Sequence, residues 1–278
     1  MDQKICELLG IWSTTPNIKE LEKVVYNVQN PKYSVKIGIV GKYTELIESY
    51  KSLDEALRHG AIHNQVKLEM IYIDSEDIEA GRLEQVESVD GILVPGGFGE
   101  RGTEGKIKAI QYARENNIPF FGICLGMQLA IIEYARNVAG LKNATSMEFD
   151  GSGEFVIHFM DGQSKDISKG GSMRLGAYEC SIDKNTLASS IYEKNEISER
   201  HRHRLEVNNQ YVEQLKDKGM IFSGMNKKLN LVEIVELSNH QYFIACQYHP
   251  EFKSRPFNPH PLFRTFVKAA LEFHKDKK

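Results

Sequence analysis

One short stretch of the chain combines a nucleophilic residue with the small neighbours that a sharp turn requires. Cys124 lies between Gly122 and Gly126, after the apolar run 118–121 and before a segment with helical spacing. This pattern is typical of a nucleophile elbow, a strand-to-helix turn too tight for side chains beside the nucleophile. The N-terminus of the following helix favours a thiolate. The stretch therefore predicts covalent catalysis by Cys124, in preference to a buried structural cysteine.

A base and a carboxylate for this cysteine are present in His249-Pro250-Glu251. Residues two apart in an extended chain face the same side, so we expect Glu251 to hold the ring of His249 in one tautomer. The apolar run 243–247 predicts a strand that ends at this pair, where open α/β sheets carry their sites. A surface turn is the alternative, and the elbow in the same chain argues against it.

A glycine-rich turn, 96–99, follows another apolar run. It lacks the spacing of the phosphate-binding glycine motifs. We interpret it as part of an oxyanion hole, with the backbone N–H groups of Gly97 and Leu125 as donors. A plain tight turn is the alternative.

The run 200–204 reads Arg-His-Arg-His-Arg. In an extended segment its three arginines would share one face. One of them is then available to pair with a substrate carboxylate. A solvated charge run remains the alternative.

The elements that must position these residues alternate between strands and helices. Apolar runs predict strands at 35–41, 66–73, 91–95 and 119–123, and helical patterns lie near 52–57, 106–115 and 125–136. This alternation is typical of an α/β fold with a mostly parallel central sheet flanked by helices. After residue 140, short runs predict additional antiparallel strands, and a helix over about 261–274 closes the domain.

The domain organisation and the composition exclude several classes of protein. The sequence pattern predicts a tail or linker over residues 1–33 and a single domain over 34–278. The net charge of −3 argues against nucleic-acid binding, and no apolar run approaches a membrane span. Four scattered cysteines indicate reduced thiols in a cytoplasmic protein, and no ligand spacing indicates a metal.

Together these stretches resemble class I (triad-type) glutamine amidotransferase domains, which have a flavodoxin-like fold. The class-wide similarity rests on residues 95–99, 122–128 and 249–251. A narrower similarity, to the C-terminal glutaminase domain of the CTP synthase family, rests on 101–102, 148–149, 170–176, 199–209 and 247–252. The tail 5–30 resembles the end of that family's synthetase domain and the linker.

The resemblance implies that Cys124 attacks the side-chain amide of L-glutamine, that His249 shuttles the proton and that Glu251 orients His249. A γ-glutamyl thioester forms, ammonia leaves, and water then releases glutamate. By position in the motifs, the resemblance also implies a set of glutamine-binding residues: Gly97, Leu125, Gly126, Met127, Gln128, Glu148 and Arg204. Within this set, Arg204 would take the α-carboxylate.

For the whole enzyme, the resemblance implies partners that this domain does not itself hold. No cofactor is expected here. The synthetase domain, absent from this sequence apart from the tail, would use ATP, Mg²⁺ and the ammonia to convert UTP to CTP, with GTP as allosteric effector, in a homotetramer. The alternative is another elbow-cysteine hydrolase, of the protease or deglycase type. The His-Pro-Glu stretch and the arginine-rich run argue against it.

Overall fold

The computed structural model describes residues 2–12, 17–42, 50–149, 151–160 and 173–277. Residues 170–172 of the narrower motif therefore lie outside the described residues. A nine-stranded sheet runs through the molecule in the order β2-β1-β3-β4-β12-β11-β10-β7-β8. A three-stranded sheet stands beside it, made of β5 (Ala144–Ser146), β6 (Glu154–Phe159) and β9 (Leu205–Val207).

The large sheet has a parallel half and an antiparallel half. The parallel strands are β1 (Tyr33–Gly41), β2 (Val66–Asp74), β3 (Gly91–Val94), β4 (Phe120–Ile123) and β12 (Phe243–Cys246). The antiparallel strands are β11 (Leu231–Leu237), β10 (Met220–Asn226), β7 (Arg174–Ile182) and β8 (Glu196–His203). The predicted α/β fold is confirmed, and four of the later strands, β7, β8, β10 and β11, extend the same sheet.

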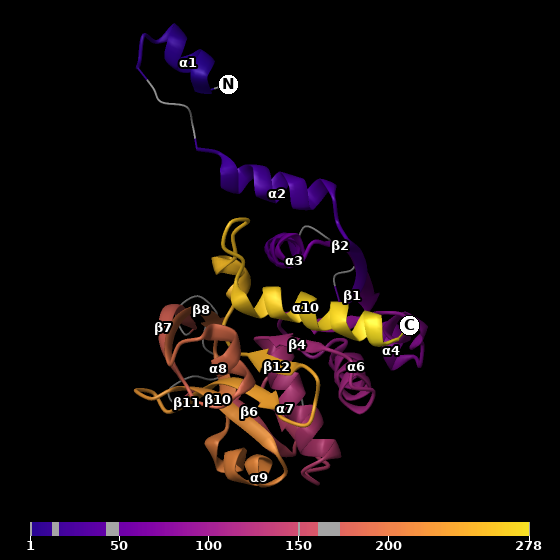
Figure 1. The fold of residues 1–278 in the computed structure, drawn as a ribbon. Coiled ribbons are helices and arrows are strands. Elements are labelled where there is room, and N and C mark those ends of the chain that lie inside the picture. The colour runs from indigo at the N-terminus through magenta and orange to yellow at the C-terminus, as the bar shows by residue number, and fades with distance from the viewer. Residues whose placement is uncertain (1, 13–16, 43–49, 150, 161–172, 278) are drawn as a thin grey trace.

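Helices cover both faces of the sheet (Figure 1). One face packs against α3 (Lys51–His63) and α10 (Pro261–Asp276), and the other against α6 (Thr103–Glu115) and α7 (Leu125–Asn137). The shorter helices are α4 (Ser75–Glu79), α5 (Glu84–Glu87), α8 (Leu187–Tyr192) and α9 (Val212–Asp217), with 3₁₀ turns η2 (Asn209–Tyr211) and η3 (Pro250–Lys253).

Strand β4 is apolar because it is buried from both sides. Phe121 packs on Phe263 and Phe266 of α10, with ring centroids 5.3 and 5.7 Å apart, while Phe120 faces the core under α7. Alternate residues of a strand point to opposite faces, so a doubly covered strand needs a continuous apolar run. Each fully buried ring contributes about 1.5–3 kcal/mol. This packing fixes the strand that leads into Cys124.

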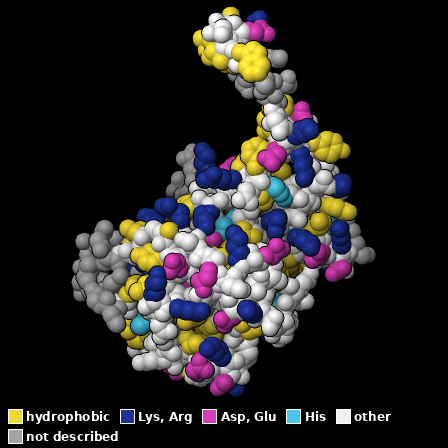
Figure 2. Space-filling view, turned by 60° about the vertical axis from the view of Figure 1, so that its left-hand side comes forward, with side chains coloured by type: hydrophobic (Ala, Val, Ile, Leu, Met, Phe, Trp, Pro, Cys, Tyr) yellow, Lys and Arg dark blue, Asp and Glu magenta, His cyan; other side chains and the backbone are white. Residues whose placement is uncertain are grey.

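The N-terminal segment forms two helices, α1 (Asp2–Leu8) and α2 (Lys19–Gln29). Asn27 of α2 donates to the backbone oxygen of Ile62 in α3 at 3.1 Å. Helix α1 lies apart at the top of Figure 1, and Figure 2 shows hydrophobic side chains gathered on this segment, where Leu8 is 78% and Trp12 88% exposed. In the described ranges, no helix is both long enough and apolar enough to cross a membrane.

Candidate active site

The predicted sharp turn is present between β4 and α7. Cys124 has φ 53° and ψ −103°, a conformation that residues with a Cβ rarely adopt. Its backbone N–H donates to the oxygen of Cys246 in β12 at 2.7 Å. A Cβ on Gly122 would lie 2.9 Å from the Cβ of Ala245, and one on Gly126 would lie 2.1 Å from a backbone oxygen of β3. Both glycines are therefore required by close packing around the turn.

His249 and Glu251 form a hydrogen-bonded pair, with 2.7 Å between Nδ1 and Oε1. A carboxylate accepts, so Nδ1 carries the proton and Nε2 is left for the cysteine. The expected extended geometry is wrong, because His249 directly precedes the 3₁₀ turn η3, in which Pro250 is the first residue. Pro suits this place since it has no N–H to satisfy. A Cβ on Gly96 would lie 2.8 Å from Cε1 of His249, so this glycine leaves room for the ring.

The charge state of His249 follows from its neighbours. Burial alone would lower the pKa of the imidazole. The sulfur of Cys124, which hydrogen-bonds the ring, and the Glu251 carboxylate outweigh burial and raise the pKa to about 10. His249 is therefore protonated at neutral pH, beside the sulfur of Cys124. An imidazolium next to a cysteine favours the thiolate, which is the form that acts as a nucleophile.

A cavity of about 200 Å³ opens beside this pair. Its lining brings together Cys124, His249, Glu251 and Gly97, with Phe98 and Arg202 among the other residues. The position of a Cβ on Gly97 lies 3.4 Å from a methyl carbon of Leu125, so the two predicted oxyanion donors are neighbours. Their role as donors stays a prediction.

The remaining predicted binding residues surround the elbow. Glu148 accepts from the backbone N–H of Gly99 at 3.0 Å, next to the cavity. Gly126, Met127 and Gln128 form the first turn of α7 and are buried, with Met127 fully so.

Arg204 has the environment that an anionic ligand would need. It is 7% exposed, and its Nε and Nη1 have no hydrogen-bond partner among the described residues. Its guanidinium lies 5.4 Å from the ring centre of Phe159. A buried guanidinium with unused donors suits a carboxylate ligand.

The arginine-rich run departs from its predicted geometry. Along β8 and beyond, Arg200 and Arg202 are exposed, whereas His201, His203 and Arg204 are buried. The expectation that three arginines share one face is wrong, because the strand ends at His203 and Arg204 lies in a bend. The bend breaks the alternation of faces.

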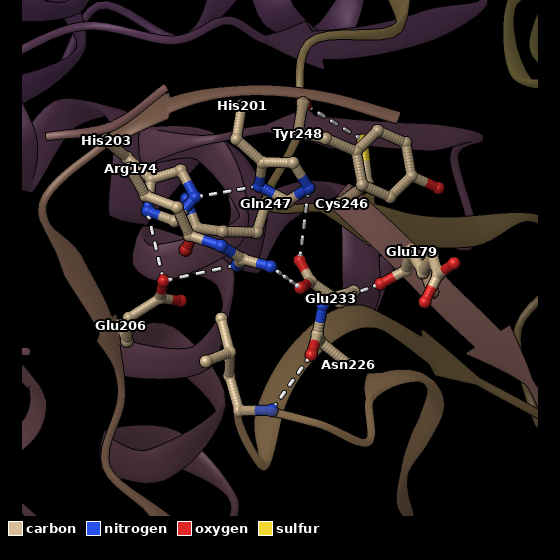
Figure 3. A network of polar contacts seen from close by, with 12 residues as sticks. Arg174, Glu179, His201, His203, Glu206, Asn226, Glu233, Cys246, Gln247 and Tyr248 are labelled. Carbon is tan, nitrogen blue, oxygen red and sulfur yellow. Dashed lines mark hydrogen bonds and ion pairs between the residues drawn. The ribbon is translucent and has the colours of Figure 1, made fainter. Parts of the chain in front are cut away.

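Those histidines belong to a buried polar cluster that the sequence analysis missed (Figure 3). Arg174 donates to Glu233 at 2.6 Å and to Glu206 at 3.3 Å, and the facing ring nitrogens of His201 and His203 are 2.9 Å apart. We call these five residues the buried network. In β8, the alternation of arginine and histidine over residues 200–203 was the signal for it.

The buried network shifts the pKa values of its carboxyls and histidines toward their neutral forms. Burial raises the pKa of Glu206 to about 8 and of Glu233 to about 7, although Arg174 opposes this. Burial and the charge of Arg174 lower the pKa of His201 to about 2 and of His203 to about 3. Within the described part of the chain, no three His, Cys, Asp or Glu residues are grouped to hold a metal ion.

Gln247 is a second residue that the sequence analysis did not single out. Its Nε2 donates to Sγ of Cys124 at 3.6 Å, and its side chain is fully buried. Its place two residues before His249 was the available signal.

A cysteine on a strand–helix elbow, with an imidazole and a carboxylate at the end of the neighbouring strand, is the arrangement typical of α/β enzymes that use a cysteine nucleophile. A family model described as "Glutamine amidotransferase class-I" matches residues 45–269. The chain belongs to the class I glutamine amidotransferase family. The protease or deglycase alternative is not favoured.

Relatives give a narrower similarity. The chain is 55% identical to the CTP synthase of Geobacter metallireducens and 54% to that of Geobacter sulfurreducens, over 100% of the chain and 52% of each relative. It thus spans about half the length of these relatives. A solved structure, the Trypanosoma brucei CTPS glutaminase domain with bound acivicin, is 41% identical with a TM-score of 0.80, over 86% of this chain and 94% of that one.

Proposed function

We propose that this chain hydrolyses L-glutamine to glutamate and ammonia, as the glutaminase part of a CTP synthase. The Cys124 thiolate attacks the side-chain carbonyl carbon, and His249 gives its proton to the departing nitrogen, which leaves as ammonia. The γ-glutamyl thioester is then attacked by water, whose proton returns to His249 while the sulfur leaves as thiolate. Glu251 keeps the ring in place through both steps.

One observation supports this proposal above the others. The His249 ring hydrogen-bonds both the sulfur of Cys124 and the Glu251 carboxylate at the end of parallel strands. This is the arrangement that proton transfer to and from an acyl-enzyme needs. The T. brucei glutaminase domain, which is 41% identical to this chain, was solved with bound acivicin, and this is consistent with a glutamine-type ligand for this chain.

Substrate recognition is proposed as follows. Arg204 binds the α-carboxylate through its unused donors, and Glu148 binds the ammonium. The backbone N–H groups of Gly97 and Leu125 stabilise the oxyanion. Gly126, Met127 and Gln128 complete the wall beside the cysteine.

The acceptor reaction is proposed to lie outside this chain. In the half of its relatives that the chain does not span, ATP, Mg²⁺ and UTP would be bound, with ammonia delivered for UTP amination. We further propose residues 1–33 as the linker to that half, GTP as effector, a homotetrameric assembly and a cytoplasmic location.

Labelling with a diazo-ketone analogue of glutamine tests the glutaminase proposal. We expect one adduct, on Cys124, that glutamine prevents and that Cys124→Ala abolishes. Cys180 and Cys246 serve as internal controls, because burial raises the pKa of both thiols and they should stay unlabelled. Labelling that glutamine does not slow, or labelling at another cysteine, would refute the proposal.

A further inference from the structure

We propose that Gln247 is a catalytic residue: its side-chain amide donates a hydrogen bond to the Cys124 sulfur and stabilises the thiolate. This inference rests on the proposed function for the identity of the reaction. It adds a third group at the sulfur, beside His249 and the N-terminus of α7. A series of contacts leaves the side-chain amide of Gln247 only one orientation.

That series begins at a backbone carbonyl. Gln128 Nε2 lies 3.1 Å from the oxygen of Leu205, which can only accept, so the NH₂ end of Gln128 must face it. The same Nε2 lies 3.1 Å from Oε1 of Gln247. The Gln247 atom that meets this donor must be the oxygen.

Its NH₂ group is therefore turned toward the sulfur. The distance from Nε2 to Sγ of Cys124 is 3.6 Å, within the range of an N–H···S contact. An amide orientation is normally ambiguous, but here the Leu205 carbonyl fixes both amides in sequence. Gln128 thus acts as a positioning residue for Gln247.

The backbone holds Gln247 in place as well. Its N–H donates to the oxygen of Glu233 in β11 at 2.9 Å, and the preceding residue, Cys246, accepts from the N–H of Cys124 at 2.7 Å. The side chains of Gln128 and Gln247 are 4% and 0% exposed. An N–H aimed at the sulfur from a dry site stabilises a thiolate more than a thiol, because the charged acceptor makes the stronger bond.

The other groups near the sulfur set the background for a pH measurement. His249 hydrogen-bonds the sulfur, Glu251 and Arg202 line the same cavity, and Cys246 is close enough for electrostatic interaction. Burial raises the pKa of the Cys246 thiol well above its usual value, so this thiol stays protonated near neutral pH. Changes at Gln247 therefore report on the Cys124–His249 pair.

The test is the pH profile of iodoacetamide alkylation, followed by mass spectrometry of the Cys124 peptide in the full chain without substrate. Gln247→Leu removes the donor at similar volume and should raise the profile's midpoint by about one pH unit, roughly tenfold in rate on the acidic side. In Gln247→Glu, a carboxylate oxygen takes the place of the NH₂ group that faces the sulfur. An oxygen cannot donate to the thiolate, so the midpoint of the profile should rise further. Gln214→Leu, which removes an exposed amide that donates to the backbone oxygen of Ala139, is the matched control and should leave it unchanged.

Two further measurements separate the explanations. Gln128→Leu should shift the midpoint in the same direction. The double variant with Gln247→Leu should have the same midpoint as Gln247→Leu alone, because both substitutions remove the same hydrogen bond to the sulfur. Thermal unfolding of each variant confirms that it is folded. An unshifted midpoint in folded Gln247→Leu overturns the inference, whereas loss of glutamine protection in the unaltered chain overturns the proposed function instead.

Discussion

The proposed triad of Cys124, His249 and Glu251 lies close enough to the buried network for their charges to interact, yet the two hold histidine in opposite forms. The pKa of His249 is raised to about 10, whereas that of His201 is lowered to about 2. Both rings are largely removed from water, with side-chain exposures of 12% and 0%. Burial therefore does not explain the difference.

The sign of the neighbouring charge explains it. His249 faces a sulfur and a carboxylate, which favour the imidazolium, while His201 faces the Arg174 guanidinium, which disfavours it. The triad opens on a cavity and the network is sealed. We therefore expect substitutions in the triad to change activity and substitutions in the network to change stability.

Removal of the nucleophile should give the largest effect on activity. Cys124→Ala is expected to lower glutamine hydrolysis by at least about 10⁴-fold, because no other group supplies a thioester. Ammonia release measures this loss, and the melting temperature should change little. Cys124→Gly, equally inactive, should be the more stable of the two by about 1 kcal/mol, because glycine tolerates φ 53°. Equal stability of the two variants would argue against backbone strain at the elbow.

Loss of the network's cation should give the largest effect on stability. Arg174→Met leaves Glu206 and Glu233 buried without a counter-charge and is expected to cost about 3–5 kcal/mol of unfolding free energy. The loss of unfolding free energy should be greater at pH 8 than at pH 6, since protonation neutralises the two carboxylates at the lower pH. Urea unfolding at the two pH values measures this loss. Lys228→Met, which breaks the exposed pair with Glu179, is the control and should change nothing measurable.

The comparison also shows what the sequence could predict. The elbow is a local signal, because tight packing around Cys124 demands glycine at both sides. His249-Pro250-Glu251 is likewise contiguous, and its hydrogen bond was expected although its backbone was not. The α/β fold followed from runs that are apolar throughout, as in β4.

The buried network was missed because its members come from four strands of two different sheets, β7, β8, β9 and β11, that meet only in the folded protein. Nothing in a linear sequence pairs Arg174 with Glu233. The run 200–204 resembled a surface charge run because all five of its residue types are basic, although three of them are buried in the fold. Gln247 was missed since its contact with Cys124 depends on the pairing of β12 with β4.

Removal of the triad carboxylate should give an intermediate effect on activity. Glu251→Gln is expected to lower glutamine hydrolysis by about 10²-fold, because a neutral amide replaces the charged acceptor that orients the ring and stabilises its positive charge. The carboxylate is one cause of the raised His249 pKa, so the variant should hold the imidazolium proton less tightly. The alkaline limb of the pH–rate profile should move to lower pH. Glu213→Gln on exposed α9 is the control, and an unshifted limb would contradict this account.

The last expected effect is a pH-dependent change in stability from Glu206. Its folded pKa, about 8, lies above the usual value of 4.5. The contribution of Glu206 to the unfolding free energy is therefore fully present below about pH 4.5. It is lost as pH rises toward 8, with a slope of up to about 1.4 kcal/mol per pH unit. His201 and His203 have the opposite sign, since their lowered pKa values cost stability as pH falls below 6.5. The two trends oppose each other between about pH 4.5 and 6.5.

Glu206→Gln isolates the carboxylate's share, because the amide oxygen can still accept from Arg174 but does not ionise. Relative to the unaltered chain, the variant should gain unfolding free energy steadily from pH 6 to pH 8. Urea unfolding at pH 5, 6, 7 and 8 measures the trend. Glu179→Gln, at an exposed carboxylate whose pKa is lowered by Lys228, should show no such gain in this range. If the difference in unfolding free energy between Glu206→Gln and the unaltered chain is the same at all four pH values, Glu206 is already ionised in the folded protein. The buried network would then hold a charged carboxylate, as the proposed triad does at Glu251.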